Sequence, residues 1–401
     1  MVRHVDGGLS GIHGIRAAAC RVGIKAEGLD LALVLCDPPA VAAGVFTSNR
    51  LQAAPVRVSR EHLERGRCRA LLINSGNANA GTGAVGLEDA HACASAVAAE
   101  VGCPREEVLL MSTGLIGKRL PLQPIVEAVP GLVASVSPAG CEAAAEAILT
   151  TDTRTKTAAV EWLHDGQTVR LGGMAKGAGM IAPHMATMLA VVATDIAAEA
   201  KALQAALRGA VDRTFNRITV DGDMSTNDSV LLLATGRAPA ASLAAKGSQA
   251  EQFHLALETV CGELARQIVL DGEGATRLAA ITVAGAASEQ QAARVAQAVS
   301  RSLLVKTALF GGDPNWGRVL AAVGAAGEEI VPERLDITYG GVAVFQAGCP
   351  VEPIPVEALN KAAAEREISV AVDLHLGSFE ATVLTTDLSL DYVRLNAEYT
   401  T

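Results

Sequence analysis

Short apolar runs alternate with longer segments of helical spacing along the chain, and this alternation constrains the fold more than any other feature. Short runs of Val, Leu, Ile and Ala between turn-forming residues are typical of buried strands, whereas longer Ala-rich segments are typical of helices. Strands are expected at Leu31–Cys36, Ala43–Thr47, Ala70–Asn74, Val108–Met111, Thr157–Leu163, Thr168–Leu171, Thr187–Ala193, Val230–Ala234, Leu278–Val283, Leu335–Phe345, Val370–His375 and Glu380–Leu384. Helices are expected at Leu87–Val101, Cys141–Leu149, Ala197–Thr214, Gln249–Ile268, Gln290–Leu303 and Val356–Glu365. This order predicts an α/β fold of layered sheets flanked by helices.

The chain is long enough to bury more than one hydrophobic core. Its 401 residues suggest two or three domains. The alternating pattern is interrupted by Val-Ala-Gly-Ala-Ala-Ser at residues 283–288. We therefore expect a larger domain of residues 1–284, followed by a smaller C-terminal α+β domain of residues 285–401.

The composition argues against several classes of partner. The formal net charge is -10, and aromatic residues make up only 3% of the chain. Nucleic-acid binding needs basic grooves and stacking rings, and a polybasic membrane patch needs clustered Lys and Arg, so neither is expected. The charge-free runs Ala70–Leu87 and Gly177–Thr194 contain Asn, Gly or Pro and are not expected to span a membrane. No secretory signal is recognised at the N-terminus, and a cytoplasmic location is expected.

Neither a metal site nor a disulfide framework is expected. The eight Cys residues show no Cys-x-x-Cys pair and several lie inside apolar runs, which favours buried free thiols. No zinc-type His/Cys spacing, phosphate-binding GxxxxGK[ST] loop or GxSxG motif is present. Asp221, Asp223 and Asp228 lack the spacing of a calcium loop, so a surface loop is the favoured interpretation.

Three segments next to expected strands carry more polar residues or glycine than a turn needs. Ile73–Asn79 places three amides and a Gly after a strand, and Met111–Gly117 places two hydroxyls and two glycines after another. Lys176–Leu189 is rich in Gly and Met and contains a lone Lys and a Thr. Loops that follow strands frequently carry binding and catalytic residues, although each segment by itself is more often a turn.

Taken together, these segments resemble one family. Lys176-Gly-Ala-Gly-Met-Ile-Ala-Pro-His-Met-Ala-Thr-Met-Leu189 is similar to the self-cleavage segment of the ornithine acetyltransferase family, the glutamate N-acetyltransferases of arginine biosynthesis. Further matches follow in the order of that family: Gly44–Arg50, the loop at Asn74, Ser112–Gly114, Thr150–Thr153, Asp221–Asp228, Asp271–Thr276, Gly312–Arg318 and Asn396–Thr401. The resemblance covers nearly the whole chain, with one departure at His184, where the family usually has another polar residue.

The resemblance implies that the chain cuts itself between Ala186 and Thr187. The products would be an α chain of residues 1–186 and a β chain of residues 187–401. Thr187 would then be the nucleophile. A Thr hydroxyl needs a base, and the α-amine freed by the cut, whose pKa is about 7.7–8.0 in peptides, is a base carried by the same residue.

The resemblance also implies roles for other residues. Thr113 and Gly114 would form the oxyanion hole, and the larger domain would be the catalytic core. The residues expected to bind substrate are Thr153, Lys176, Thr187, Glu273, Asn396 and Thr401, so the C-terminal tail would return to the site. By charge, Lys176 suits a carboxylate and Glu273 suits an ammonium group.

The implied reaction moves the acetyl group of N2-acetyl-L-ornithine to L-glutamate through a Thr187 acetyl-enzyme, without a metal or an organic cofactor. Some members of the family also use acetyl-CoA as a donor, and the two fragments are expected to stay associated as an α2β2 heterotetramer. The implied fold is shared with self-processing aminopeptidases of the DmpA type. Such an aminopeptidase or amidase, in which water is the acceptor, is the alternative enzyme, and an unprocessed binding homologue is the alternative of another class.

Overall fold

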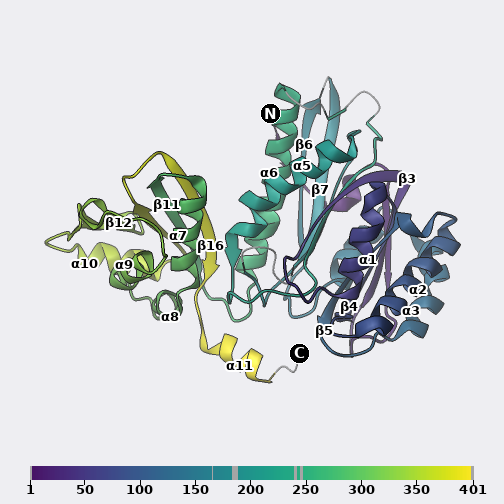
Figure 1. The fold of residues 1–401 in the computed structure, drawn as a ribbon, viewed down its shortest axis with the longest axis horizontal. Coiled ribbons are helices and arrows are strands. Elements are labelled where there is room, and N and C mark those ends of the chain that lie inside the picture. The colour runs from purple at the N-terminus through teal and green to yellow at the C-terminus, as the bar shows by residue number, and fades with distance from the viewer. Residues whose placement is uncertain (1, 165, 183–187, 239–241, 244–246, 399–401) are drawn as a thin grey trace.

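The computed structural model describes residues 2–164, 166–182, 188–238, 242–243 and 247–398. Within these residues the chain builds two mixed sheets. Each sheet carries its own helices, and the two parts lie side by side (Figure 1). Mixed sheets flanked by helices confirm the layered α/β fold expected from the sequence.

The larger part is built on a nine-stranded sheet in the order β1–β6–β7–β8–β10–β3–β4–β5, with β2 beside β3. Its strands are β1 Arg3–Val5, β2 Ile15–Cys20, β3 Leu31–Phe46, β4 Arg67–Asn77, β5 Val108–Leu115, β6 Lys156–His164, β7 Gln167–Lys176, β8 Leu189–Thr194 and β10 Ser229–Ala234. β6 and β7 pair antiparallel and form a hairpin. β4 pairs parallel with β5, and β8 pairs parallel with β10.

Strand β3 belongs to both halves of this sheet. The sequence predicts two separate strands here, Leu31–Cys36 and Ala43–Thr47, but the structure has one strand with a register irregularity between Leu35 and Ala40. The first half of β3 pairs with β2 and β4, and the second half pairs with β10. One long strand therefore connects two groups of strands that the sequence pattern leaves apart.

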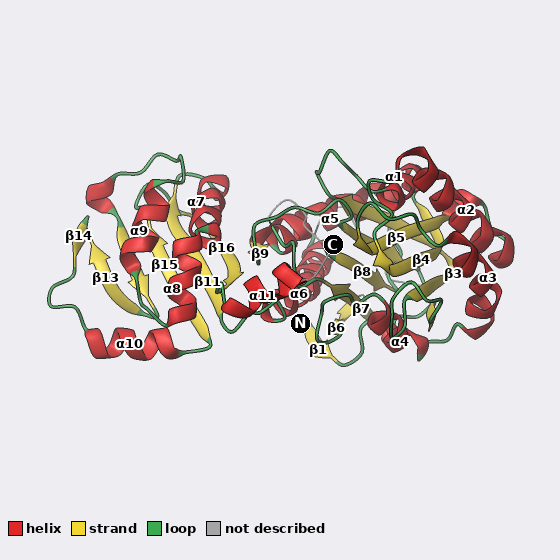
Figure 2. Ribbon diagram, turned by 90° about the horizontal axis from the view of Figure 1, so that it is seen from below, coloured by secondary structure: helices red, strands yellow, loops and turns green. Residues whose placement is uncertain are grey.

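The two halves of the sheet pack face to face, and helices cover their outer faces (Figure 2). Val34 and Leu71 on one half share a buried core with Val191 and Leu231 on the other. The helices that pack on β2, β4 and β5 are α1 Ala54–His62, α2 Gly83–Val101, α3 Leu122–Ser135 and α4 Gly140–Ala147. α5 Ala200–Arg213 and α6 Ser248–Leu270 cover the half that contains β6, β7 and the second part of β3.

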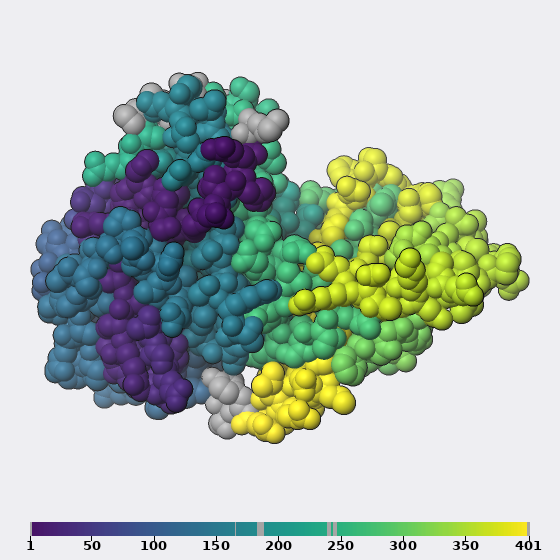
Figure 3. All heavy atoms as spheres, turned by 180° about the vertical axis from the view of Figure 1, so that it is seen from behind, coloured from purple at the N-terminus to yellow at the C-terminus, as the bar shows by residue number. Residues whose placement is uncertain are grey.

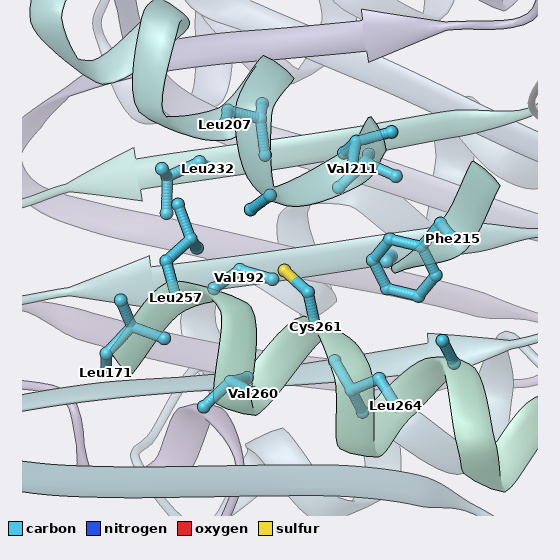
Figure 4. Packing of buried hydrophobic residues seen from close by; sticks show 14 of the residues in the cluster. Leu171, Val192, Leu207, Val211, Phe215, Leu232, Leu257, Val260, Cys261 and Leu264 are labelled. Carbon is cyan, nitrogen blue, oxygen red and sulfur yellow. The ribbon is translucent and has the colours of Figure 1, made fainter. Parts of the chain in front are cut away.

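The core beneath α5 and α6 consists largely of aliphatic residues, as the low aromatic content requires. Leu207 of α5 and Leu257 of α6 pack against Val192 of β8 (Figure 4). Val191, the preceding residue of β8, points into the core between the two half-sheets. Because successive side chains of a strand point to opposite faces, a continuous apolar run such as β8 serves both cores.

The C-terminal part is built on a seven-stranded sheet in the order β14–β13–β12–β15–β11–β16–β9. Its strands are β9 Ile218–Thr219, β11 Leu278–Ala286, β12 Asp336–Tyr339, β13 Val342–Gln346, β14 Cys349–Pro350, β15 Glu367–Asp373 and β16 Phe379–Thr386. Its helices are α7 Glu289–Arg301, α8 Leu303–Gly311, α9 Trp316–Gly324 and α10 Val356–Ala364. The single strand expected at Leu335–Phe345 is a hairpin, since the chain turns at Gly340 and Gly341.

The boundary expected between residues 284 and 285 falls inside β11. This strand pairs with β15 as far as Ala284 and with β16 again at Ala286, on either side of a register shift. The φ angle of Gly285 is +64°, and the apolar pattern breaks there because the strand bulges. Apart from the short edge strand β9, the second sheet therefore begins at Leu278, and the chain passes between the two parts before that residue.

Several helices lie where the sequence pattern predicts none. They are α1, α3, α8, α9 and α11 Leu390–Glu398. No residue of α11 is buried, and Leu390 and Val393 are exposed. A helix without an apolar face against a core cannot be recognised by its periodicity. α11 lies at the junction of the two parts (Figures 1 and 2).

Two further expectations concern membranes and cysteines. Within the described ranges, no helix combines the length and the hydropathy needed to cross a bilayer. All eight Cys residues are free thiols, as expected. Five of them are buried, whereas Cys349 on the edge strand β14 is exposed.

Candidate functional site

Part of the predicted site lies outside the described residues. Ala186, Thr187 and Thr401 fall there, as does His184. The next described residue is Met188, which directly precedes β8. The other predicted residues are all described, and they are Thr113, Gly114, Thr153, Lys176, Glu273 and Asn396.

Thr113 and Gly114 lie together near the end of β5. Because β4 and β5 are parallel, their carboxyl ends reach the same edge of the sheet, where Gly114 pairs with Gly76. A Cβ atom at Gly114 would lie 2.3 Å from the carbonyl carbon of Gly76, and the φ angle of Gly114 is +125°. Only glycine fits at this position, so the residue type that follows Thr113 is set by the close approach of two strands.

The amides at the end of β4, together with Asn227, brace this edge from within the protein. Ser112 donates a hydrogen bond of 2.5 Å to the side chain of Asn74, and Asn77 donates to two carbonyls of the next loop. Asn227 donates at 2.8 Å to the carbonyl of Ser112. All four side chains are buried. They bind to backbone and to one another, so their visible role is to hold the loops in place.

Lys176, the last residue of β7, lies against Thr113. Its Nζ atom is 3.2 Å from the Oγ1 atom of Thr113, and both side chains are buried. An ammonium group has only donors, so the Thr113 oxygen must accept this hydrogen bond. The hydroxyl proton of Thr113 is then available for a second acceptor. The expectation that Lys176 is near the reacting centre thus has a geometric basis, and a solvated surface position is excluded.

A buried charge network connects Lys176 with Thr153. Asp152 lies 4.0 Å from Lys176 and 2.6 Å from Lys156, and Lys156 lies 2.5 Å from Asp271. Asp271 in turn accepts hydrogen bonds from the backbone and the hydroxyl of Thr153. The side chains of all four charged residues are at most 4% exposed. Two cations and two anions balance, as burial of charge requires.

The pKa values of this network follow from burial and pairing. Burial lowers the pKa of Lys176, although the neighbouring Asp152 carboxylate opposes this shift. Burial by itself would raise the pKa of Asp152, but Lys176 and Lys156 outweigh it and hold that pKa below its ordinary value. Asp152 is therefore ionised at neutral pH and compensates the charge of the two lysines.

Three of the predicted substrate residues line one cavity of about 490 Å³. Thr153 lies before β6, Glu273 follows α6, and Asn396 is part of α11, so the cavity lies where the two sheet-bearing parts meet. Asn396 donates a hydrogen bond of 2.9 Å to the Glu273 carboxylate. The tail helix thus contacts this cavity. Figure 3 shows α11 from behind, in yellow below the junction of the two parts.

Glu273, which lines this cavity, also contacts the segment that precedes the predicted cut. Glu273 donates its backbone N–H to the carbonyl of Ala178 at 2.9 Å. A Cβ atom at Gly179 would lie only 2.5 Å from the Glu273 carboxylate. Glycine at 179 therefore lets the acidic side chain lie directly against the backbone.

Asp228 of the Asp221–Asp228 segment is buried and Asp221 is half-buried, which corrects the expectation of a surface loop for these two residues. Asp228 is 0% exposed and accepts the backbone N–H of Met188 at 2.9 Å. Burial raises the pKa of Asp228 well above its ordinary value. Asp221 accepts the N–H of Met180 at 2.6 Å, and burial, aided by the nearby Asp223 and Glu273 charges, raises its pKa to about 6.

These residues show what sequence reasoning missed. The spacing of Asp152, Lys156 and Asp271 in the sequence does not indicate that they form a network. Asp228 lies in a segment that the sequence pattern predicts to be a loop. The only signal was that Asp152, Asp271 and Asp228 lie inside segments that match the family, and Lys156 lacks even that signal. In the part of the chain that the structure describes, no group of three or more His, Cys, Asp and Glu side chains is arranged to hold a metal ion.

Comparison with known proteins points to one family. The model of the ArgJ family matches residues 16–401. The arginine biosynthesis bifunctional protein ArgJ of Geobacter sulfurreducens is 47% identical over 395 residues, which cover 97% of this chain and 100% of that protein. The protein of the same description from Methylococcus capsulatus is 49% identical over 393 residues, covering 97% of this chain and 96% of that protein. The chain in a crystal structure of the arginine biosynthesis bifunctional protein ArgJ from Bacillus halodurans has 40% sequence identity to this one. The match covers 51% of this chain and 96% of that chain, with a TM-score of 0.49.

Proposed function

The chain belongs to the ArgJ family, and from this premise we propose that it transfers the acetyl group of N2-acetyl-L-ornithine to L-glutamate. The products are ornithine and N-acetyl-L-glutamate. Full-length similarity to bifunctional arginine-biosynthesis proteins favours this reaction over that of the alternative aminopeptidase or amidase.

The proposed catalyst is made by the chain itself. Cleavage between Ala186 and Thr187 converts the amide nitrogen of Thr187 into a free amine. That amine takes the proton of the Thr187 hydroxyl while the oxygen attacks the acetamide carbonyl, and an acetyl-enzyme forms as ornithine leaves with the proton. The α-amine of glutamate then attacks the acetyl ester and restores the Thr187 hydroxyl.

The contact between Lys176 and Thr113 is the observation that carries this proposal. Thr113 accepts from Lys176, so its own proton can be donated to the oxyanion of the tetrahedral intermediate, beside the N–H of Gly114. Lys176 also places positive charge near that oxyanion. Because both residues are buried, their interactions with a developing charge are weakly screened by water.

The cavity at Glu273 is proposed to hold the substrate side chain. Glu273 suits the side-chain ammonium of N-acetylornithine, and Thr153 and Asn396 line the same cavity. Thr401 is proposed to complete the site from the C-terminal tail. In this arrangement Lys176 lies at the reacting end and Glu273 at the side-chain end.

Four further points belong to the proposal. The reaction proceeds without a metal or an organic cofactor. Acetyl-CoA serves as a second acetyl donor, in keeping with the bifunctional description of the relatives. The α and β fragments remain together as an α2β2 heterotetramer, and the enzyme works in the cytoplasm.

Self-cleavage is the first test. On a denaturing gel the purified protein should run as two fragments, and the second should begin Thr-Met-Leu-Ala-Val. Thr187→Ala should stay intact and inactive, whereas Thr187→Ser should keep some processing because the hydroxyl remains. A Thr187→Ala protein that still splits at this bond would refute the mechanism.

The acceptor and the donor are tested separately. With N-acetylornithine and glutamate, the enzyme should release ornithine and form N-acetylglutamate. With N-acetylornithine alone, it should release little acetate. Rapid acetate release without glutamate would favour the amidase. Acetyl-CoA and glutamate, supplied without N-acetylornithine, would show whether the second donor is used.

A further inference from the structure

The two substrates of the proposed reaction have side chains of opposite charge. The side chain of N-acetylornithine ends in an ammonium group, and that of glutamate ends in a carboxylate. Both must reach the same acetylated residue in turn. A cavity with Glu273 as its only charge would attract the first side chain and repel the second.

Arg154 adds positive charge to the wall of this cavity. It directly follows Thr153, and its side chain is 51% exposed. Its Nε atom lies 4.0 Å from Asp271, which already binds Lys156 at 2.5 Å. The anionic partner of Arg154 is thus largely neutralised by another cation, and the guanidinium is loosely held.

Arg366 lines the same cavity from the C-terminal part. It directly precedes β15, and its carbonyl accepts the N–H of Leu278 at 2.9 Å, so its backbone is fixed. Its side chain is exposed and makes no ion pair with any described residue. A guanidinium has five donors and no acceptor, and its planar geometry matches a carboxylate.

We infer that Arg154 and Arg366 recognise the side-chain carboxylate of the acceptor glutamate, in the cavity where Glu273 recognises the side-chain ammonium of N-acetylornithine. The inference rests on the proposed function and extends it. One cavity then serves both half-reactions because it offers two cations beside Glu273, while Asp271, its other acidic lining residue, is paired with Lys156. Asn396, which donates to Glu273, lowers the repulsion between Glu273 and the incoming glutamate.

The first experiment compares Michaelis constants in the acetylornithine-to-glutamate reaction. Arg154→Gln and Arg366→Gln should each raise the KM for glutamate roughly tenfold, since a hydrogen bond to a charged group is lost. The KM for N-acetylornithine should stay within about twofold or fall, because a repelling cation is removed. Arg213→Gln, which alters an exposed arginine of α5 paired with Glu258, is the control and should change neither constant.

The second experiment measures acceptor specificity. Glutamine has the size of glutamate without its side-chain charge, so the intact enzyme should prefer glutamate strongly. The double variant Arg154→Gln/Arg366→Gln should lose most of this preference, because its cavity no longer offers a cation to the carboxylate. A preference that survives in the double variant would overturn the inference.

Binding without turnover separates this inference from the proposed function. Calorimetric titration with glutamate or with ornithine, in the absence of any acetyl donor, should show weaker glutamate binding in the arginine variants and unchanged ornithine binding. If both ligands weaken equally, or if only the KM for acetyl-CoA rises, the inference fails while the proposed function stands. If the intact enzyme does not transfer acetyl from N-acetylornithine to glutamate, the proposed function itself fails.

Discussion

The Nζ atom of Lys176 lies 3.2 Å from the Oγ1 atom of Thr113, so the ends of β7 and β5 meet at a buried point. These residues are far apart in the sequence and belong to opposite halves of the folded sheet. The Lys176 ammonium is a donor and leaves the Thr113 proton available for an oxyanion. The contact therefore links the charge network that holds Lys176 to the proposed catalytic step.

Removing the Thr113 hydroxyl should slow acetyl transfer far more than it weakens substrate binding. Thr113→Ala is expected to lower kcat by roughly 100- to 1,000-fold, because the donor acts on charge that appears only in the transition state. Thr113→Ser keeps the oxygen and should retain most of the activity. Steady-state kinetics would check both variants, and a normal kcat in Thr113→Ala would remove this residue from the oxyanion hole.

A side chain at position 114 should disrupt the site through a backbone clash. Gly114→Ala would place a Cβ atom 2.3 Å from Gly76, and β4 and β5 would have to separate. Gly117 also has a positive φ angle but has open space around it, so Gly117→Ala is a matched control for backbone strain alone. Urea denaturation should show a further loss of roughly 2 kcal/mol or more in Gly114→Ala. Equal stabilities would show that the strands yield easily.

Removing the tail should impair turnover without unfolding the protein. Deletion of residues 395–401 takes away Asn396, which contacts Glu273, but no residue of α11 is buried. Folding and self-cleavage should persist, while KM rises and kcat falls, since the tail orients the substrate and excludes water.

Point variants on the same helix refine this prediction. Asn396→Ala should reproduce part of the kinetic defect, because the amide that contacts Glu273 is lost. Arg394→Gln alters an exposed residue of α11 that pairs with Asp391 and should have little effect. Normal kinetics in the truncated protein would mean that Asn396 and Thr401 do not bind substrate.

Asp221 should make the folded protein less stable as the pH rises from about 4 to 6. Its pKa is raised to about 6 in the fold, so in this range the folded protein keeps a proton that the unfolded chain has lost. The free energy of unfolding therefore falls with rising pH. Asp221→Asn cannot ionise and should gain on the order of 2 kcal/mol relative to the native protein across this window. Thermal unfolding measured between pH 4 and pH 7 would check this, and parallel curves would contradict it.

The class of fold and many of its elements could be predicted from local sequence patterns. Continuous apolar runs predicted buried strands such as those at Ala70–Asn74 and Val230–Ala234, because local hydrophobicity decides whether a strand can be buried on both faces. The family motifs predicted that Thr113, Lys176 and Glu273 belong to one site. Helix α11 was not predicted, because it has no apolar face buried against a core. The bulge at Gly285 was not predicted either, because it interrupts the apolar pattern of β11 without ending the strand.

Which side chains meet and which charges are buried became known from the folded structure alone. Lys156 and Asp271 pair at 2.5 Å although 115 residues separate them, and no local pattern records such a contact. In the same way, Arg366 reaches the cavity of Arg154 and Glu273 because the C-terminal sheet packs beside the first. Lys176 has no charged neighbour in the sequence that could compensate its burial. A charge removed from water needs such a partner, and the fold supplies one by placing Asp152 4.0 Å away.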